Sequence, residues 1–319
     1  MTTSKRESIL VCYTVPPEML AAAKIEFPQF DWHQSTPTDA EAIASASIIF
    51  GKPDIKLLRS ARALKWLQNP SAGVEKWAEC DAFLQGSFQL TTASGMHESC
   101  AQHAFALLLA LSRKIHFYNK TLVPGGWKSK READAPLVLT GQTLGVLGLG
   151  AIGKRICELG RAFGMKTIGV NRSGAPASEA GETHPISKLD TILPRCDALI
   201  LILPATRETD NLIDARRLSL LPKHALLINA GRGNAIDEAA LLAALKNQNL
   251  SAAALDVFKQ EPLPADSEFY KLENVLITPH LGGERPDYDE RAFEIFLQNL
   301  HRYTRSEPLK NAVEKSRGY

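Results

Sequence analysis

The sequence predicts an α/β protein built from two doubly wound parallel-sheet domains. Short apolar runs of strand length alternate with helix-like segments along most of the chain, a pattern typical of parallel sheets covered on both faces. A glycine-rich stretch at 141–154 has the spacing of a dinucleotide-binding turn. With 319 residues, the chain is long enough for two domains that each have a core.

The first hundred residues contain four apolar runs separated by helix-like segments. We expect strands at 9–13, 47–51, 65–68 and 89–92, and helices at 17–26 and 54–61. Ligands bind at the carboxyl ends of parallel strands, so the loop after the third strand is a candidate site. Its residues Ser71, Ala72 and Gly73 can offer backbone N–H groups to a substrate carboxylate, although a plain turn explains this stretch equally well.

A segment rich in alanine and leucine, 99–116, predicts a long apolar helix. We expect this helix to connect the two domains, and its apolar character also allows a dimer contact. The smaller, substrate domain is expected to comprise residues 1–98 and 286–319, and the dinucleotide-binding domain residues 99–285. A helix expected at 288–305 would return the chain to the first sheet.

Three glycines, Gly148, Gly150 and Gly153, follow an apolar strand at 144–147 and precede apolar residues at helical spacing. The first glycine allows a tight turn, the second lets a pyrophosphate approach the backbone, and the third lets helix and strand pack closely. The N-terminus of the helix adds free N–H groups and the positive end of a dipole. The intervening residues expected to line the same site are Leu149, Ala151 and Ile152.

The next strand, 167–170, is followed by Asn171, Arg172 and Ser173. An acidic residue at this position would bind the ribose 2′-hydroxyl of NAD, and this chain has none. Arg172 can instead pair with a 2′-phosphate, while Asn171 and Ser173 can add hydrogen bonds. We therefore predict NADP(H) as the preferred cofactor, with NAD(H) possible. The alternative interpretation is that Arg172 is a solvated loop residue.

The second sheet is completed by strands expected at 198–203, 225–229, 252–256 and 275–278, which makes six strands with the two above. Parallel strands end at the same edge of a sheet, so the residues after them should meet at the cofactor. The strand-end residues expected to contact the cofactor are Leu203, Pro204, Thr209, Ala230, Gly231, Arg232, Asp256, His280 and Gly282.

Four of the strand-end side chains match the needs of 2-keto acid reduction. Arg232, between two glycines, can bind a carboxylate in bidentate fashion. His280 can exchange a proton near neutral pH, and Glu261 can pair with it and favour the imidazolium. Asp256 can hold the nicotinamide carboxamide. Each residue alone could be structural, but we do not expect all four to lack a function. His97, which precedes the expected helix at 99–116, is a weaker candidate for the same site.

Composition gives no reason to expect other classes of partner. The net charge is +2, from 37 basic and 35 acidic residues, which does not predict binding to nucleic acid or to an anionic membrane. The five scattered cysteines contain no C-x-x-C, so neither a disulfide framework nor a thiolate zinc site is expected, and no other feature calls for a metal. No apolar run is long enough to span a membrane, so the expected location is cytoplasmic.

Over nearly its whole length the chain resembles the D-isomer-specific 2-hydroxyacid dehydrogenases. The resemblance implies a Rossmann dinucleotide-binding domain inserted in a smaller, flavodoxin-like substrate domain. The Asn171–Ser173 sequence is similar to that of NADPH-using glyoxylate/hydroxypyruvate reductases. The matching stretches are Ser71–Val74, Gly126-Trp127, Gly148–Gly153, Ala162–Met165, Leu203-Pro204, Asn229–Gly233, Leu255–Phe258, Glu261-Pro262 and Asn274–His280.

The resemblance also implies roles for particular residues. Arg232, Glu261 and His280 would be the catalytic residues, with Arg232 and His280 also contacting substrate. The backbone at 71–73 would bind the substrate carboxylate, the helix region 99–116 would build a homodimer, and the product would have the D configuration. One departure is Cys100-Ala-Gln-His103, where the family often has Val-Ala-Glu-His.

The function predicted from these features is that of an NADP(H)-dependent D-2-hydroxyacid dehydrogenase working mainly as a 2-keto acid reductase. Hydride would pass between nicotinamide C4 and substrate C2, with His280 as the acid and base. Two alternatives stay open. One is an NAD-dependent member acting on a phosphoglycerate-, formate- or phosphite-type substrate. The other is a non-catalytic, corepressor-like sensor of NAD(H).

Overall fold

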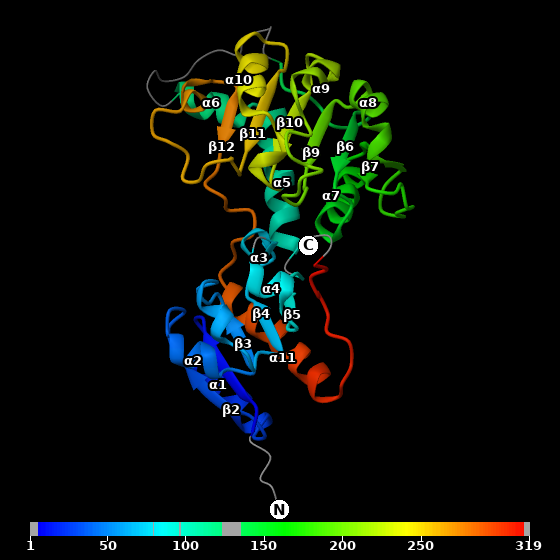
Figure 1. Ribbon diagram of the computed structural model, residues 1–319. Coiled ribbons are helices and arrows are strands. Elements are labelled where there is room, and N and C mark those ends of the chain that lie inside the picture. Colours follow the sequence, from blue (N-terminus) through cyan, green and yellow to red (C-terminus); the bar gives the residue numbers. More distant parts are fainter. Residues whose placement is uncertain (1–5, 79, 96, 123–134, 316–319) are drawn as a thin grey trace, which may run out of the picture. The chain divides into compact units, whose positions relative to one another are not determined.

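The computed structural model describes residues 6–78, 80–95, 97–122 and 135–315. The chain divides into two compact units, one formed by Met1–Met96 with Arg285–Tyr319 and the other by His97–Glu284. Each unit contains one parallel sheet with helices packed on both faces (Figure 1). This arrangement confirms the predicted α/β class.

Unit 1 contains a five-stranded sheet whose order is β2-β1-β3-β4-β5, the order of flavodoxin-like folds. The strands are β1 (Ser8–Cys12), β2 (Asp31–Gln34), β3 (Ile48–Gly51), β4 (Trp66–Asn69) and β5 (Gln89–Thr92). The helices are α1 (Pro17–Glu26), α2 (Ala40–Ser45), α3 (Glu75–Ala78), α4 (Asp81–Gln85) and, from the end of the chain, α11 (Tyr288–Thr304).

Successive residues of β1 enter two different clusters of the unit 1 core. Ile9 packs in the cluster that contains buried residues of α11, whereas Leu10 packs in the cluster on the opposite face of the sheet. The indole of Trp66 stacks on the ring of Phe296 from α11, with centroids 5.1 Å apart. The C-terminal helix therefore completes the core of the N-terminal sheet.

Unit 2 contains a seven-stranded sheet in the order β12-β11-β10-β9-β6-β7-β8, which is the Rossmann order with one added strand. The strands are β6 (Thr143–Leu147), β7 (Lys166–Asn171), β8 (Glu182–Pro185), β9 (Ala198–Leu201), β10 (Leu226–Asn229), β11 (Ala252–Leu255) and β12 (Val275–Ile277). The helices are α5 (His97–Ser112), α6 (Ile115–Leu122), α7 (Ala151–Ala162), α8 (Leu189–Ile192), α9 (Ala215–Leu220) and α10 (Glu238–Lys246).

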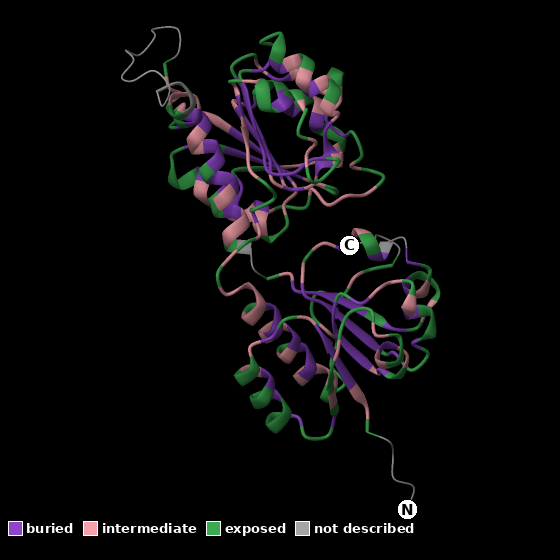
Figure 2. Cartoon of the chain, turned by 90° about the vertical axis from the view of Figure 1, so that its left-hand side faces the viewer, coloured by how far each residue is buried: buried purple, intermediate pink, exposed green. Residues whose placement is uncertain are grey.

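The central strands of unit 2 are buried on both faces, as Figure 2 shows for the purple strands between their helices. Val146 of β6 packs in the cluster that contains Leu108 of α5, while the next residue, Leu147, packs in the opposite cluster. The strand order reverses between β6 and β9, and ligands bind at such a switch point. The glycine-rich turn after β6 lies at this point.

Two local expectations were wrong, and two strands were not predicted. The edge strands β2 and β8 were not predicted, because their residues are mostly partly or fully exposed and lack an apolar run. The helix expected at 54–61 is only a 3₁₀ turn, Leu57–Ser60. The helix expected at 99–116 is broken after Ser112, because Lys114 adopts the left-handed backbone region with φ of 56°.

Asp237 caps the N-terminus of α10, since its Oδ1 accepts a hydrogen bond from the backbone N–H of Ala240 at 3.1 Å. Within the described ranges, no helix is both long enough and apolar enough to cross a membrane.

Candidate active site

The glycine-rich turn after β6 has one open position between two crowded ones. Gly148 has φ of +101°, and a Cβ there would lie 2.2 Å from the carbonyl oxygen of Ile202. A Cβ at Gly153 would lie 1.8 Å from the carbonyl oxygen of Gly148. A Cβ at Gly150 would meet no atom within 4 Å. The first and third glycines therefore allow the turn to pack, and the second leaves space above it.

The N-terminus of α7 faces this open position. Gly150 is the N-cap, it makes no side-chain cap hydrogen bond, and the first turn carries no acidic residue. The N–H groups of the first turn and the positive end of the helix dipole can therefore bind an anion. A cofactor pyrophosphate fits here, with Leu149, Ala151 and Ile152 in the same turn.

The loop after β7 is held by its own polar side chains. Oδ1 of Asn171 accepts from the N–H of Gly174 at 2.6 Å, and its Nδ2 donates to the carbonyl of Ala175 at 2.8 Å. The hydroxyl of Ser173 accepts from the N–H of Ala175 at 3.3 Å. Arg172 extends from this loop, and its Nη2 lies 2.5 Å from Oε1 of Glu208.

The loops after β9 and β10 are in close contact. A Cβ at Gly231 would lie 2.6 Å from the backbone nitrogen of Leu203, so only glycine allows this approach. The hydroxyl of Thr209 donates to the carbonyl of Pro204 at 2.7 Å and accepts from the N–H of Thr206 at 2.9 Å. These contacts order the 203–209 loop. Ala230 precedes Gly231 in the loop after β10.

Asp256 is buried at the end of β11 and holds the segment that carries His280. Its Oδ1 accepts from Thr278 at 2.6 Å and from the N–H of Leu281 at 2.8 Å, and its Oδ2 accepts from the N–H of Gly282 at 2.9 Å. Nε2 of His103 lies 3.1 Å from the same Oδ1. Burial raises the pKa of the Asp256 carboxyl, but these hydrogen bonds outweigh burial and lower the pKa to about 2.

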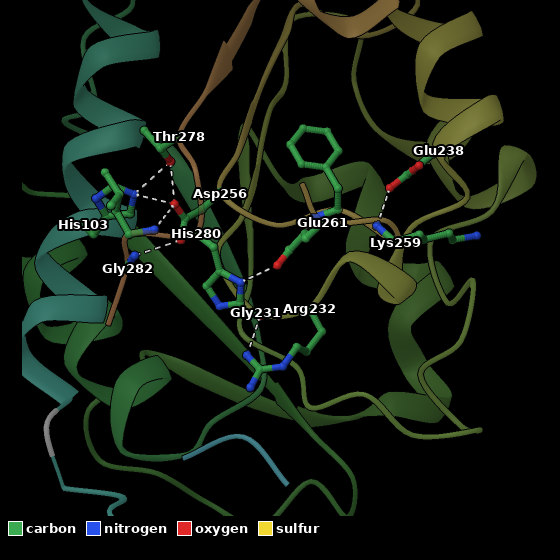
Figure 3. Close-up of polar contacts among 12 residues, drawn as sticks. His103, Gly231, Arg232, Glu238, Asp256, Lys259, Glu261, Thr278, His280 and Gly282 are labelled. Carbon is green, nitrogen blue, oxygen red and sulfur yellow. Dashed lines mark hydrogen bonds and ion pairs between the residues drawn. The ribbon is translucent and has the colours of Figure 1, made fainter. Parts of the chain in front are cut away.

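His280 adopts the left-handed backbone region, with φ of 56°. Its N–H donates to the carbonyl of Asp256 at 2.9 Å, so the surrounding bonds hold a conformation that non-glycine residues seldom adopt. Nδ1 of His280 lies 2.7 Å from Oε2 of Glu261 (Figure 3). Oε1 of Glu261 accepts from the N–H of Phe258 at 2.9 Å, which orients the carboxylate. Because Nδ1 donates to a carboxylate, Nε2 is the nitrogen available for proton exchange.

Arg232 lies at the end of the loop after β10. Its Nη1 donates to the carbonyl of Gly231 at 2.9 Å. A Cβ at Gly233 would lie 2.0 Å from the carbonyl carbon of Phe258, so the Arg232 turn packs directly on the segment that leads to Glu261. In Figure 3 the guanidinium of Arg232 lies below the imidazole of His280 in the view.

The structure places the remaining predicted residues as follows. The loop of Ser71, Ala72 and Gly73 belongs to unit 1, where Nδ2 of Asn69 donates to the carbonyl of Ser71 at 2.9 Å and to that of Gly73 at 2.8 Å. Gly126 and Trp127 lie outside the described residues, and so does the side chain of His97.

Sequence reasoning missed two residues near the site. His103 was not among the candidate site residues, yet it contacts Asp256 and also lies 3.1 Å from Thr278 Oγ1. Glu208 was not singled out at all. Neither has a local signal, because its partner is distant in sequence. Within the described ranges, no group of three or more His, Cys, Asp or Glu could hold a metal ion.

The fold and this site together define a class. The sheet has the Rossmann order and an open glycine turn, and the loops that follow its strands carry a histidine–carboxylate pair and an arginine. This combination is typical of NAD(P)-dependent oxidoreductases. The sequence model of the D-isomer specific 2-hydroxyacid dehydrogenase NAD binding domain matches residues 105–282. The chain belongs to this family and is an NAD(P)-dependent oxidoreductase acting on CH–OH groups.

Known proteins resemble the chain over most of its length. It is 32% identical to the glyoxylate reductase of Thermococcus litoralis, over 86% of this chain and 84% of that protein. It is 27% identical to a D-isomer specific 2-hydroxyacid dehydrogenase of Xanthobacter autotrophicus Py2 solved with NADPH and MES, with a TM-score of 0.84 and coverage of 98% and 100%. An NADPH-dependent glyoxylate/hydroxypyruvate reductase of Sinorhizobium meliloti solved with NADP and sulfate is 26% identical, with a TM-score of 0.82 and the same coverage.

Proposed function

We propose that the protein is an NADP(H)-dependent D-2-hydroxyacid dehydrogenase that works mainly as a reductase of small 2-keto acids. The observation that carries this proposal is the 2.7 Å contact between His280 and Glu261, in the loops that follow β12 and β11 of a dinucleotide-binding sheet. The glyoxylate reductase relative and the two NADPH- or NADP-bound neighbours support the same activity.

His280 acts as the acid in the reduction. Glu261 accepts a hydrogen bond from Nδ1–H and fixes the orientation of the ring, so that Nε2 is the nitrogen that protonates the developing alkoxide. In the reverse direction Nε2 takes the hydroxyl proton. The side chain of His280 is 46% exposed, so a small molecule can reach it.

Arg232 binds the substrate. Its planar guanidinium can give two parallel hydrogen bonds to a carboxylate, or one to the carboxylate and one to the keto oxygen. This contact would hold the substrate so that C2, and not C1, receives the hydride. The backbone N–H groups of 71–73 are proposed as a second set of donors to the carboxylate.

The chain binds the cofactor along the carboxyl edge of the unit 2 sheet. When bound, NADPH supplies the hydride that reduces C2. The Gly150 turn receives the pyrophosphate, and Arg172 binds the 2′-phosphate. Asn171 and Ser173 shape the loop through the hydrogen bonds within it. Asp256 holds the 278–282 segment, and its contact with the nicotinamide carboxamide stays a prediction.

We also propose a homodimer through the 99–116 region. Two large apolar side chains of unit 2 are exposed: Ile115, within this region, at 58% and Val138, outside it, at 62%. Their exposure supports a contact with a second copy of the chain. The molar mass in solution, measured by light scattering, tests this proposal. A mass near that of one 34.9 kDa chain would contradict it.

The test of the activity follows the nicotinamide absorbance when the protein is mixed with NADPH or NADH and a panel of 2-keto acids that includes glyoxylate, hydroxypyruvate and pyruvate. We expect oxidation of NADPH with at least one small 2-keto acid. Oxidation of NADH alone would contradict the role of Arg172. Binding of both cofactors without oxidation of either would favour the sensor alternative. The His280→Gln variant is the negative control.

A further inference from the structure

Two loops stand on either side of the glycine-rich turn in unit 2. In the sheet, β6 lies between β7 and β9, so the loops that follow β7 and β9 flank the turn that follows β6. Arg172 comes directly after β7, and Glu208 lies in the loop after β9. Nη2 of Arg172 is 2.5 Å from Oε1 of Glu208, although the two residues are 36 positions apart. The ion pair therefore joins the two loops that flank the pyrophosphate turn.

Both partners extend from ordered backbone. The side chain of Asn171 closes the turn that carries Arg172, by accepting a hydrogen bond from Gly174. The hydroxyl of Thr209 closes the turn that carries Glu208, by donating to Pro204. The side chains themselves are 54% and 65% exposed, so each can change its partner without disturbing the core. Backbone geometry thus brings a carboxylate to the arginine proposed to bind the 2′-phosphate.

We propose that Glu208 sets the discrimination between NADP(H) and NAD(H) by competing with the 2′-phosphate for Arg172. This inference rests on the proposed role of Arg172. A phosphate monoester carries a charge of about −1.5 to −2 at neutral pH, so it must replace Glu208 on the guanidinium and lie near a like charge. A ribose 2′-hydroxyl is neutral, and a carboxylate can accept its hydrogen bond. Glu208 therefore reduces the preference for NADP(H) that Arg172 creates.

The expected size of the effect follows from exposure. Exposed ion pairs contribute little and are screened by salt, so removing the charge of Glu208 should change the preference by about two- to fivefold. The same change should become smaller as ionic strength rises, because the competition is between charges at the surface.

The experiment measures, by titration calorimetry, the Kd values of NADP⁺ and NAD⁺ for the wild type and for Glu208→Gln. We expect the ratio of the NAD⁺ Kd to the NADP⁺ Kd to rise about two- to fivefold in the variant. The fragments 2′,5′-ADP and 5′-AMP should show the same rise, because they differ in the 2′-phosphate alone. A ratio that stays constant or falls would overturn the inference.

A matched control is Glu268→Gln. Glu268 is also half exposed and pairs with Lys246, at the end of α10, at 2.8 Å, so this variant removes one charge and one ion pair away from the glycine-rich turn. It should leave the ratio unchanged, and an equal rise in both variants would mean that net charge alone is responsible, which overturns the inference.

Arg172→Ala separates this inference from the proposed function. We expect that variant to lower the ratio strongly. An unchanged ratio in Arg172→Ala would contradict the cofactor assignment itself. A lower ratio in Arg172→Ala together with an unchanged ratio in Glu208→Gln would contradict the Glu208 inference alone.

Discussion

Nδ1 of His280 lies 2.7 Å from Oε2 of Glu261, while Oε1 of the same carboxylate accepts the backbone N–H of Phe258. The carboxylate is therefore fixed by the backbone on one side and fixes the imidazole on the other. Both side chains remain partly exposed, at 46% for His280 and 37% for Glu261. The pair combines a fixed orientation with access to solvent, as a residue that exchanges protons with a substrate requires.

Replacing His280 with glutamine should lower kcat by about 10²- to 10⁴-fold. Glutamine can still donate to Glu261, but it cannot give a proton to the substrate oxygen at neutral pH. Cofactor binding should be nearly unchanged, because the glycine turn and Arg172 are not altered. Steady-state kinetics and calorimetric titration with NADPH measure the two effects, and turnover close to that of the wild type would refute the assignment.

Replacing Glu261 with glutamine tests the carboxylate while keeping its shape. The amide oxygen can still accept from Phe258, but the negative charge next to His280 is lost. We expect kcat to fall by about tenfold or more, because an amide oxygen holds the Nδ1–H of His280 less strongly than a carboxylate does. Glu238→Gln is the matched control, since Oε1 of Glu238 accepts from the N–H of Lys259 at 2.7 Å in the neighbouring loop (Figure 3). Equal rates in the two variants would argue against a role for Glu261.

Replacing Arg232 with lysine keeps the charge and removes the planar fork. We expect kcat/KM for the 2-keto acid to fall by about ten- to a hundredfold, because one charged hydrogen bond is lost. The Kd of NADPH should not change. If the variant retained the wild-type kcat/KM, Arg232 would not be the group that orients the substrate.

Two glycines of the same turn should respond differently to alanine. At Gly150 a Cβ has no neighbour within 4 Å, so Gly150→Ala should leave the thermal midpoint within about 2 °C of the wild type and weaken cofactor binding about tenfold or more. At Gly153 a Cβ would lie 1.8 Å from the Gly148 carbonyl oxygen, so Gly153→Ala should lower the midpoint clearly. Thermal unfolding and NADPH titration distinguish them, and the reverse pattern would contradict this description of the turn.

Asp256 should contribute to stability in a pH-dependent way. The pKa of its carboxyl is lowered from 3.8 to about 2, so the folded state favours the ionised form. The stabilisation is complete above pH 3.8 and is lost as the pH falls through about 2. Asp256→Asn should therefore cost about 2 kcal/mol at pH 7, and this cost should shrink as the pH falls below about 4. Denaturant unfolding of both proteins across this range measures the difference. A cost independent of pH would show that the charge is not responsible.

Local patterns were sufficient to predict the class of fold and the glycine turn. The central strands are buried on both faces, and burial leaves an apolar run that can be recognised without a structure, as at Leu144–Leu147. The spacing of Gly148, Gly150 and Gly153 is likewise a local property of a strand, a turn and a helix. Edge strands such as β2 and β8 leave no such run, since they are partly exposed. The break at Lys114 occurs without glycine or proline, so no residue there predicts it.

The contacts that orient the candidate site depended on strand order and on close packing of loops. His103 and Asp256 are 153 positions apart, yet Nε2 and Oδ1 lie 3.1 Å from each other because α5 packs beside β11. Arg172 meets Glu208 across β6 for the same kind of reason. A sequence indicates which side chains follow each strand. Which of them come within hydrogen-bonding distance depends on the path of the backbone through the whole unit, since a shift of about 1 Å is enough to break such a bond.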